Sequence, residues 1–182
     1  MFTYKIDEQI SLKLIDLHDA DEVFALTDEN RDYLKQWLPW LDTTTRVEDT
    51  RGFIQSSIKG YAANKSLTTV ILYKEKIVGI AGYNELDWSN RVAKIGYWLA
   101  SSYQGLGIMT RVAHALTSYA IEKLHVNRVD IRAAVDNKKS RAIPERLGFT
   151  YEGCLRQAEW LYDHYVDHAV YSMLREEWQK RP

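Results

Sequence analysis

The sequence has almost no cysteine, no long hydrophobic run and no excess of charge of either sign. Its single cysteine, Cys154, excludes an intramolecular disulfide and a metal cluster held by thiolates. No apolar run approaches the roughly 20 residues that a membrane-spanning helix needs. The start of the chain, Met1 followed by FTYKIDEQ, lacks the apolar core of a secretion signal. We therefore expect a cytoplasmic protein that acts at no membrane.

Charge and length set further limits. The 24 Lys and Arg residues against 25 Asp and Glu give a net charge of −1, so no global basic field points to a nucleic-acid partner. With 46% hydrophobic residues, a chain of 182 residues can bury a sizeable core. No repeat, low-complexity segment or linker divides it. We expect one domain over residues 1–182.

One stretch, residues 95–124, reads as a strand, a glycine-rich turn and a long helix. The run from Ile95 to Ala100 is apolar and aromatic, as in a buried strand. Gly105 and Gly107 allow backbone conformations that side chains forbid and let the backbone approach a ligand closely. The apolar residues after the turn recur at helical spacing. Because N–H groups stay unpaired at a helix N-terminus, this stretch favours a phosphate or pyrophosphate ligand.

The details of the turn decide between phosphate ligands. A nucleotide P-loop would need a Gly-Lys-Ser/Thr ending, and a dinucleotide fingerprint would need three glycines. The run GYWLASSYQGLGIMT instead resembles the acetyl-CoA loop of the GCN5-related N-acetyltransferases, Gln/Arg-x-x-Gly-x-Gly/Ala, with Gln104 and Gly107 as matches. Met109 replaces the small residue of the wider superfamily, as in the branch of the ribosomal-protein N-terminal acetyltransferases and their spermidine- and antibiotic-modifying relatives. The loop alone also fits a turn whose glycines have only a structural role.

The pattern along the chain predicts a mixed α/β fold. The strand of residues 127–135 should lie parallel to the strand of Ile95, because the intervening helix provides the crossover. The order matches the acyl-CoA N-acyltransferase fold that the resemblance implies, a mostly antiparallel sheet splayed between two parallel strands and flanked by helices. We expect strands over 10–14, 67–73, 76–83, 91–100, 127–135, 150–159 and 165–174, and helices over 19–27, 31–37, 47–64, 110–124 and 140–147.

The resemblance implies acetyl-CoA as the co-substrate, bound in the wedge between the strands of Ile95 and Val129, and no metal. Main-chain groups of Trp98 to Ala100, at the end of the strand of Ile95, would pair with the pantetheine arm. The loop from Gln104 to Thr110 would wrap the pyrophosphate. A basic edge would suit the outer phosphate, although a solvated surface position is the default for any one of its residues. That edge comprises Lys138, Lys139, Arg141 and Arg146. The expected cofactor-binding residues are Trp98, Leu99, Ala100, Gln104, Gly105, Leu106, Gly107, Ile108, Met109, Thr110, Asn137 and Ser140.

The run VDNKKSR resembles the Asn-x-x-Ser step of the same family. The Asn137 amide can bind an amide-bearing ligand arm, and the Ser140 hydroxyl can protonate a leaving thiolate. Both residues are also ordinary helix caps, and the two roles are compatible. Most of the superfamily has a tyrosine acid where this chain has Pro144. Ser140 is then the nearest candidate for the acid.

Transfer to an amine also needs a base, because an ammonium group has no free lone pair. Glu159 ends the strand GCLRQAE, which resembles the ribosomal-protein acetyltransferases, where the matching glutamate takes the proton through a water. Glu85 and bulk water are the alternatives. His164 and His168 share a strand face without an evident third metal ligand. Cys154 is expected to be a small core residue.

These observations favour direct acetyl transfer from acetyl-CoA to a primary amine, with Glu159 as base and Ser140 as acid. The resemblance implies the N-terminal α-amine of a protein, such as a ribosomal protein, as the acceptor. Acetylation of a polyamine or aminoglycoside, and a non-catalytic acyl-CoA-binding module of the same fold, stay open, as does a homo-oligomer. The aromatic cluster Trp37, Leu38 and Trp40 either closes the core or lines the acceptor entrance.

Overall fold

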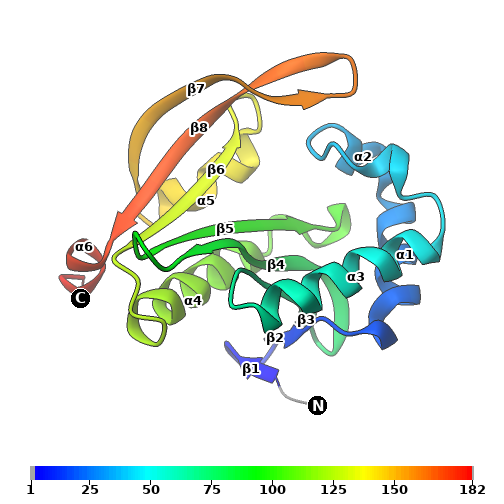
Figure 1. Cartoon of the computed structure of the whole chain (residues 1–182), viewed down its shortest axis with the longest axis horizontal. Coiled ribbons are helices and arrows are strands. Elements are labelled where there is room, and N and C mark those ends of the chain that lie inside the picture. The colour runs from blue at the N-terminus through cyan, green and yellow to red at the C-terminus, as the bar shows by residue number, and fades with distance from the viewer. Residues whose placement is uncertain (1–2, 182) are drawn as a thin grey trace.

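The computed structural model describes residues 3–181, which form an eight-stranded sheet flanked by helices (Figure 1). The strand order is β1-β2-β3-β4-β5-β6-β8-β7. The strands are β1 (Thr3–Lys5), β2 (Ile10–Leu14), β3 (Leu67–Tyr73), β4 (Lys76–Asp87), β5 (Val92–Leu99), β6 (Arg128–Ala134), β7 (Thr150–Leu161) and β8 (His164–Leu174). The helices are α1 (Ala20–Glu29), α2 (Arg31–Lys35), α3 (Val47–Ala62), α4 (Ile108–Glu122), α5 (Lys138–Arg146) and α6 (Arg175–Gln179). Short 3₁₀ helices are η1 (Leu17–Asp19), η2 (Leu41–Thr43) and η3 (Ser101–Tyr103).

The predicted fold is confirmed in its elements and in its pairing. Each expected strand is present, β5 and β6 are parallel, and the other pairs of the described sheet are antiparallel. The boundaries differ by a few residues: β4 runs to Asp87, and α4 and α5 each begin two residues early. The short elements β1 and α6 were not predicted. Three and five residues are too few to show a recognisable hydrophobic period.

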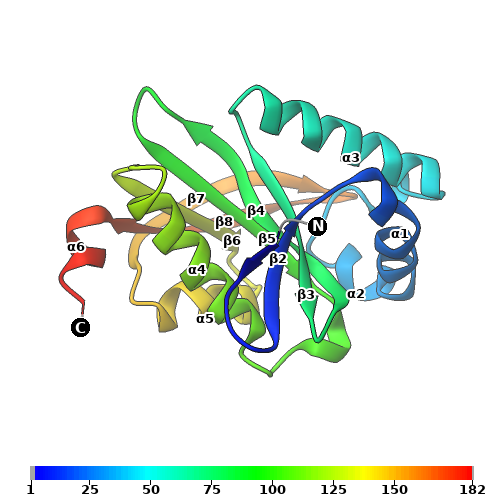
Figure 2. The ribbon, with the colours of Figure 1, turned by 90° about the horizontal axis from the view of Figure 1, so that it is seen from below.

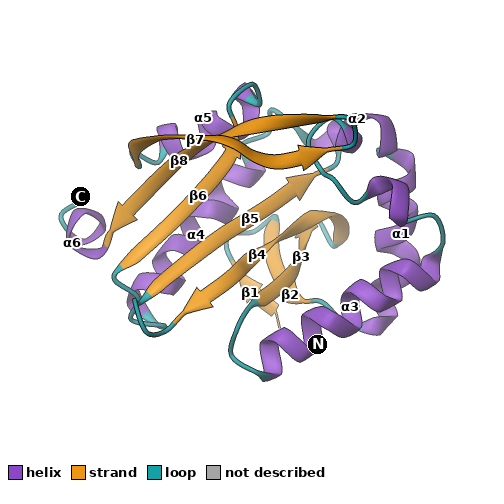
Figure 3. Ribbon diagram, turned by 45° about the horizontal axis from the view of Figure 1, so that its top comes forward, coloured by secondary structure: helices purple, strands orange, loops and turns teal. Residues whose placement is uncertain are grey.

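The wedge arises because the parallel pair is short. β5 pairs with β6 only as far as Ile95 opposite Ile131. Beyond that point β5 stays with β4 as far as Leu99, while β6 stays with β8 as far as Ala134. The two parallel strands therefore separate and leave main-chain groups of β5 without a strand partner (Figure 3).

Helices cover both faces of the sheet, as Figure 2 shows for α4 and α3. One core cluster lies under α4, whose buried stripe includes Val112 and Leu116 packed with Ile131. A second cluster under α1 and α3 includes Val23 and Ile54. Because each fully buried aliphatic side chain contributes about 1.5–3 kcal/mol, these two clusters fix the sheet from which the wedge opens.

The tip of the β7–β8 hairpin contacts the segment after α2, on the far side of the wedge (Figures 1 and 3). The Tyr162 hydroxyl donates to the Leu38 carbonyl at 2.5 Å and accepts from the Leu41 N–H at 3.1 Å. The Lys35 ammonium lies 4.6 Å from the centre of the Tyr162 ring. Segments from opposite ends of the chain thus meet across the open end of the wedge.

The expectation that Cys154 is a core residue is wrong. Cys154 lies on β7, the edge strand of the sheet, and is exposed, with its Sγ 3.8 Å from Asp167 Oδ2. Most side chains of β7 are in contact with solvent. Among the described residues, no helix is long and apolar enough to cross a membrane.

Candidate active site

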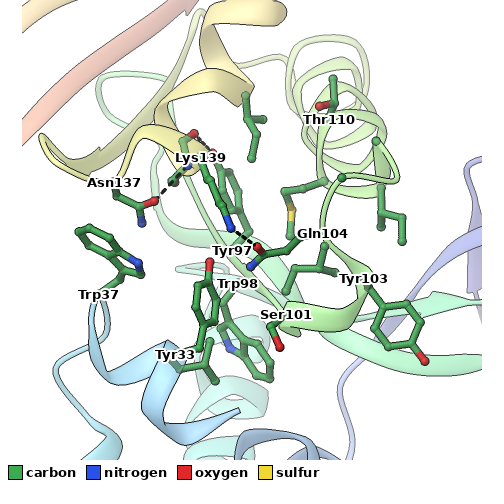
Figure 4. A pocket seen from close by; sticks show the side chains of 18 of the residues that line it. Tyr33, Trp37, Tyr97, Trp98, Ser101, Tyr103, Gln104, Thr110, Asn137 and Lys139 are labelled. Atoms are coloured by element: carbon green, nitrogen blue, oxygen red, sulfur yellow. Dashed lines mark hydrogen bonds between the residues drawn. The ribbon is translucent and has the colours of Figure 1, made fainter.

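A cavity of about 1010 Å³ occupies the wedge and lies among α2, β5, the following loop, α4 and α5 (Figure 4). It brings together most of the residues expected to bind the cofactor. These are Trp98, Leu99, Gln104, Gly105, Gly107, Ile108, Met109, Thr110, Asn137 and Ser140. Two expected residues do not line it. Ala100 is fully buried, with its N–H donated to the Val78 carbonyl at 2.9 Å, and the Leu106 side chain is half exposed.

The loop before α4 presents a row of free amides to this cavity. Within residues 3–181, no backbone or side-chain acceptor lies within hydrogen-bond distance of the N–H groups from Gly105 to Thr110. Gly105 and Gly107 have φ angles of 77° and 69°, in the left-handed region that favours glycine. Gly107 is the N-cap of the 15-residue helix α4. Unpaired amides and the positive end of a helix dipole together form an anion site.

Arg111, which the sequence analysis missed, holds the loop in this orientation. Its guanidinium donates to the Leu106 carbonyl at 3.1 Å and to the Gly107 carbonyl at 3.3 Å. A third bond, 2.7 Å to Asp7 Oδ2, ties the side chain to the N-terminal segment. The backbone N–H of Gln9, with Arg111, keeps the pKa of Asp7 below its ordinary value. Arg111 thus holds the carbonyls of Leu106 and Gly107, while the N–H groups of the loop stay unpaired beside the cavity.

The N-terminus of α5 forms the opposite wall. Asn137 Oδ1 accepts from the Ser140 N–H at 3.1 Å, so Asn137 is confirmed as the N-cap of α5, and its amide nitrogen faces the cavity. Ser140 is not a cap, because it lies within the first turn of the helix. Tyr97, another residue missed from sequence, spans the wedge and donates its hydroxyl to the Ser140 carbonyl at 3.1 Å. Burial raises the pKa of Tyr97, so the phenol keeps its proton at neutral pH.

Only part of the predicted basic edge reaches the cavity. Lys139 donates to Gln104 Oε1 at 2.8 Å, and Arg146 donates to Thr110 Oγ1 at 3.1 Å, so both bridge the two walls. Arg141 instead donates to the Tyr171 hydroxyl at 2.9 Å, away from this cavity. Lys138 does not line the cavity either.

The aromatic residues Tyr33 and Trp37 also line this cavity, opposite α5 (Figure 4). The Lys139 ammonium lies 5.9 Å from the centre of the Tyr33 ring. The sequence analysis linked Trp37 to the core or to the acceptor entrance. Tyr33, on α2, and Trp37, just after it, show that this part of the chain lines the wedge, which no local sequence pattern indicated.

The two candidate bases have different partners. Glu159 Oε2 lies 3.2 Å from His168 Nε2, and the two side chains are 30% and 20% exposed. An irregularity of β7 between Leu155 and Glu159 sets this position, and His168 pairs with Ala134 at the end of β6. This pairing places Glu159 on the β8 side of the wedge, but Glu159 lines neither the cavity in the wedge nor the second cavity described below.

Glu85 forms an ion pair with Lys94, with Oε2 and Nζ 2.7 Å apart. Because Lys94 engages the Glu85 carboxylate while Glu159 lies beside a histidine, the geometry favours Glu159 over Glu85. His164 lies 2.6 Å from Asp163 Oδ1, separate from the His168 and Glu159 pair. No group of three or more metal-ligating side chains occurs in the part of the chain that the structure describes.

A second cavity, of about 730 Å³, adjoins the first across β5. Leu38, Tyr97 and Trp98 line both cavities, and the Trp98 and Trp40 rings lie 6.5 Å apart. The charged side chains that line the second cavity are all acidic. They are Glu48 and Asp49, at the start of α3. One cavity can thus hold a phosphate-bearing ligand while the other receives a cation.

Comparison with known proteins agrees with this geometry. Residues 9–150 match the family described as acetyltransferase (GNAT) domain. The chain is 37% identical over 180 residues, 98% of each sequence, to a putative ribosomal N-acetyltransferase, YdaF, of Bacillus subtilis (strain 168). It is 31% identical over 172 residues, 94% of this chain and 96% of the relative, to the ribosomal-protein-serine acetyltransferase of Escherichia coli (strain K12).

Two solved structures are similar over nearly the whole chain. RimL, a ribosomal L7/L12 alpha-N-protein acetyltransferase in complex with coenzyme A, has a TM-score of 0.93 and 30% identity, covering 97% of this chain and 99% of RimL. The microcin C7 self-immunity acetyltransferase MccE, in complex with acetyl-CoA and AMP, has a TM-score of 0.88 and 34% identity, covering 93% and 94%.

Proposed function

Since the chain belongs to the acetyltransferase (GNAT) family and is an acetyl-CoA-dependent N-acetyltransferase, we propose that its acceptor is the N-terminal α-amine of a protein, with a ribosomal protein as first candidate. The names of its relatives support this acceptor: one is a ribosomal-protein-serine acetyltransferase and another a putative ribosomal N-acetyltransferase. The observation that carries the proposal is the pair of cavities that meet at Tyr97 and Trp98, one lined by free amides and the other by carboxylates.

Acetyl-CoA would bind in the larger cavity. Its pyrophosphate would accept hydrogen bonds from the amides of Gly105 to Thr110, and its outer phosphate would lie near Lys139 and Arg146. The pantetheine arm would pair with main-chain groups of Trp98 and Leu99 that β6 leaves free, whereas both main-chain groups of Ala100 are already bonded. This arrangement directs the thioester toward the junction of the two cavities.

The acceptor would enter through the smaller cavity as an ammonium ion. The carboxylates of Glu48 and Asp49 raise the local concentration of cations at its lining. Backbone N–H groups of Thr45 and Arg46 keep the pKa of Asp49 below its ordinary value, so this carboxylate stays ionised at neutral pH.

The proposed reaction is a direct transfer without a covalent enzyme intermediate. Glu159, through a water molecule, removes a proton from the ammonium group, and the free lone pair attacks the thioester carbonyl carbon. The C–N bond forms and the C–S bond breaks. Ser140 then gives its hydroxyl proton to the thiolate of coenzyme A, and the second proton that the nitrogen loses on becoming an amide returns to the Ser140 oxygen. Holding the two reactants at one junction supplies most of the rate gain through orientation.

An acceptor screen tests the proposal. Turnover of acetyl-CoA is measured with peptides that begin with Ser or Ala, with the same peptides blocked at the α-amine, with polyamines and with aminoglycosides. We expect turnover with the free peptides and none with the blocked peptides. Turnover confined to polyamines or aminoglycosides would replace the proposed acceptor. Acetyl-CoA binding without turnover of any amine would favour a non-catalytic module.

A further inference from the structure

The smaller cavity contains a polar side chain that the mechanism above does not use. Asn84 is the extra residue of a bulge in β4: Tyr83 pairs with Ile95 and Glu85 pairs with Lys94, which leaves Asn84 without an opposite residue. A bulge interrupts the alternation of side chains between the two faces of a sheet and so turns a side chain in a new direction. Here the bulge directs Asn84 into the cavity that it lines.

The space that Asn84 occupies exists because residue 96 is glycine. A Cβ at Gly96 would lie 2.6 Å from both Cγ and Oδ1 of Asn84, closer than atoms can approach. Gly96 is not in the left-handed region, so close packing against the Asn84 amide is its evident requirement. The cavity floor opposite Gly96 is again glycine, Gly82. The Asn84 amide therefore lies over the bare backbone of β5, beside Gly96, which is two residues before Trp98.

The Asn84 amide is free to bind a ligand. The side chain is exposed, and within residues 3–181 neither its oxygen nor its nitrogen has a hydrogen-bond partner. An amide is neutral and has both a donor and an acceptor, so it complements a peptide group, which also has both. A protonated polyamine offers donors alone and can use only the Asn84 oxygen.

We propose that the Asn84 carboxamide binds the first peptide group of the acceptor, adjacent to its reactive amine, and so selects peptide N-termini over amines that lack an amide. This inference rests on the proposed function and adds the group that recognises the acceptor. Gly96 leaves the space that this amide occupies. The carboxylates of Glu48 and Asp49 attract cations of either kind and contribute no such selection.

The test compares Asn84→Ala and Asn84→Asp with the parent enzyme, using an N-terminal peptide and a polyamine as acceptors. We expect both variants to raise the KM for the peptide on the order of tenfold, because each removes the donor to the peptide carbonyl. The KM for acetyl-CoA and the turnover number at saturating peptide should stay near the parent values. With the polyamine, Asn84→Asp should equal or exceed the parent. Asn90→Ala, on the exposed turn after β4, serves as the matched control.

A second variant probes the position of the amide. Gly96→Ala would displace the Asn84 side chain, so it should raise the peptide KM to a similar degree, and the double variant Gly96→Ala with Asn84→Ala should show little further change. Thermal unfolding of each variant identifies any loss caused by misfolding.

The possible failures are distinguishable. If the parent enzyme does not acetylate peptides at all, the proposed function itself is wrong. If the parent acetylates peptides and Asn84→Ala keeps its peptide KM, Asn84 does not bind the acceptor. Additive effects of Gly96→Ala and Asn84→Ala would show that Gly96 acts independently of the amide.

Discussion

The two cavities are built in different ways. The larger one takes its anion site from one continuous stretch, the loop before α4, and uses backbone N–H groups with two glycines of positive φ. The smaller one is assembled from α1, η2, α3, β3, β4 and β5, and its polar groups are side chains. A backbone site tolerates many side chains but depends on conformation, whereas a side-chain site can change its ligand through single substitutions. The cofactor side is therefore expected to be fixed and the acceptor side adjustable.

The largest expected effect concerns the proton transfer that joins the two sides. Glu159→Gln keeps the shape of the side chain but removes its ability to take a proton at neutral pH, so turnover should fall roughly 10²–10⁴-fold. The acidic limb of the pH–rate profile should shift or vanish, and high pH should partly restore the rate as free amine becomes available. Steady-state rates across pH measure both effects.

Glu85→Gln is the matched control for this change, because Glu85 is already paired with Lys94. It should leave the rate nearly unchanged. If instead Glu85→Gln is inactive and Glu159→Gln is active, the base lies on β4. Should neither change matter, bulk water takes the proton.

Gly107→Val should disrupt the cofactor side. A β-branched residue is strained at a φ of 69°, so the loop would shift and its amides would lose their common direction. We expect the Kd for acetyl-CoA to rise by roughly 10- to 100-fold, more than the loss of thermal stability would explain, since several charge-assisted bonds are affected. Calorimetric titration measures the affinity. A folded variant that binds acetyl-CoA as tightly as the parent would show that the loop is only structural.

Ser140→Ala should have a smaller effect, confined to the chemical step. The hydroxyl is needed when the thiolate departs, while the Ser140 main chain keeps its bonds to Asn137 and Tyr97. Turnover should fall by about tenfold with little change in the Kd for acetyl-CoA. The opposite result, a large loss of affinity with normal turnover of bound enzyme, would make Ser140 a cofactor-binding residue instead.

The smallest expected effect lies outside both cavities and concerns the stability of the fold rather than activity. Arg128 donates two bonds to Glu152, at 2.8 and 2.6 Å, and Ser172 adds a third. Arg128 first, then Ser172, lower the pKa of Glu152 to about 2 from an ordinary value of 4.5. Because the folded-state pKa is depressed, this stabilisation is present above about pH 4.5 and is lost as the pH falls toward 2.

Glu152→Gln should therefore lower the Tm slightly at pH 7 and reduce the acid dependence of Tm below pH 4.5, with unchanged peptide and acetyl-CoA KM values. Melting curves from pH 7 to pH 3 provide the measurement. An altered KM would mean that the C-terminal strands transmit changes to the cavities.

The same contrast between local backbone features and side chains brought together by folding separates what the sequence predicted from what it missed. The strands, the crossover helix and the glycine loop depend on local periodicity and on backbone conformation, and both are visible in consecutive residues. Tyr97, Arg111 and Asn84 were missed because their roles come from tertiary contacts. Tyr97 meets α5 across the wedge, Arg111 reaches Asp7 from α4, and the bulge at Asn84 is a property of strand register. The pairing of Glu159 with His168 likewise depends on the irregular β7–β8 register.

The most direct test of the division between the two sides is a set of steady-state kinetics on the parent, Gly107→Val and Asn84→Ala enzymes, varying acetyl-CoA and an N-terminal peptide independently. We predict that Gly107→Val raises the KM for acetyl-CoA and leaves the peptide KM near the parent value, while Asn84→Ala does the reverse. If each variant raises both KM values by the same factor, the two cavities act as one binding unit and the division is wrong.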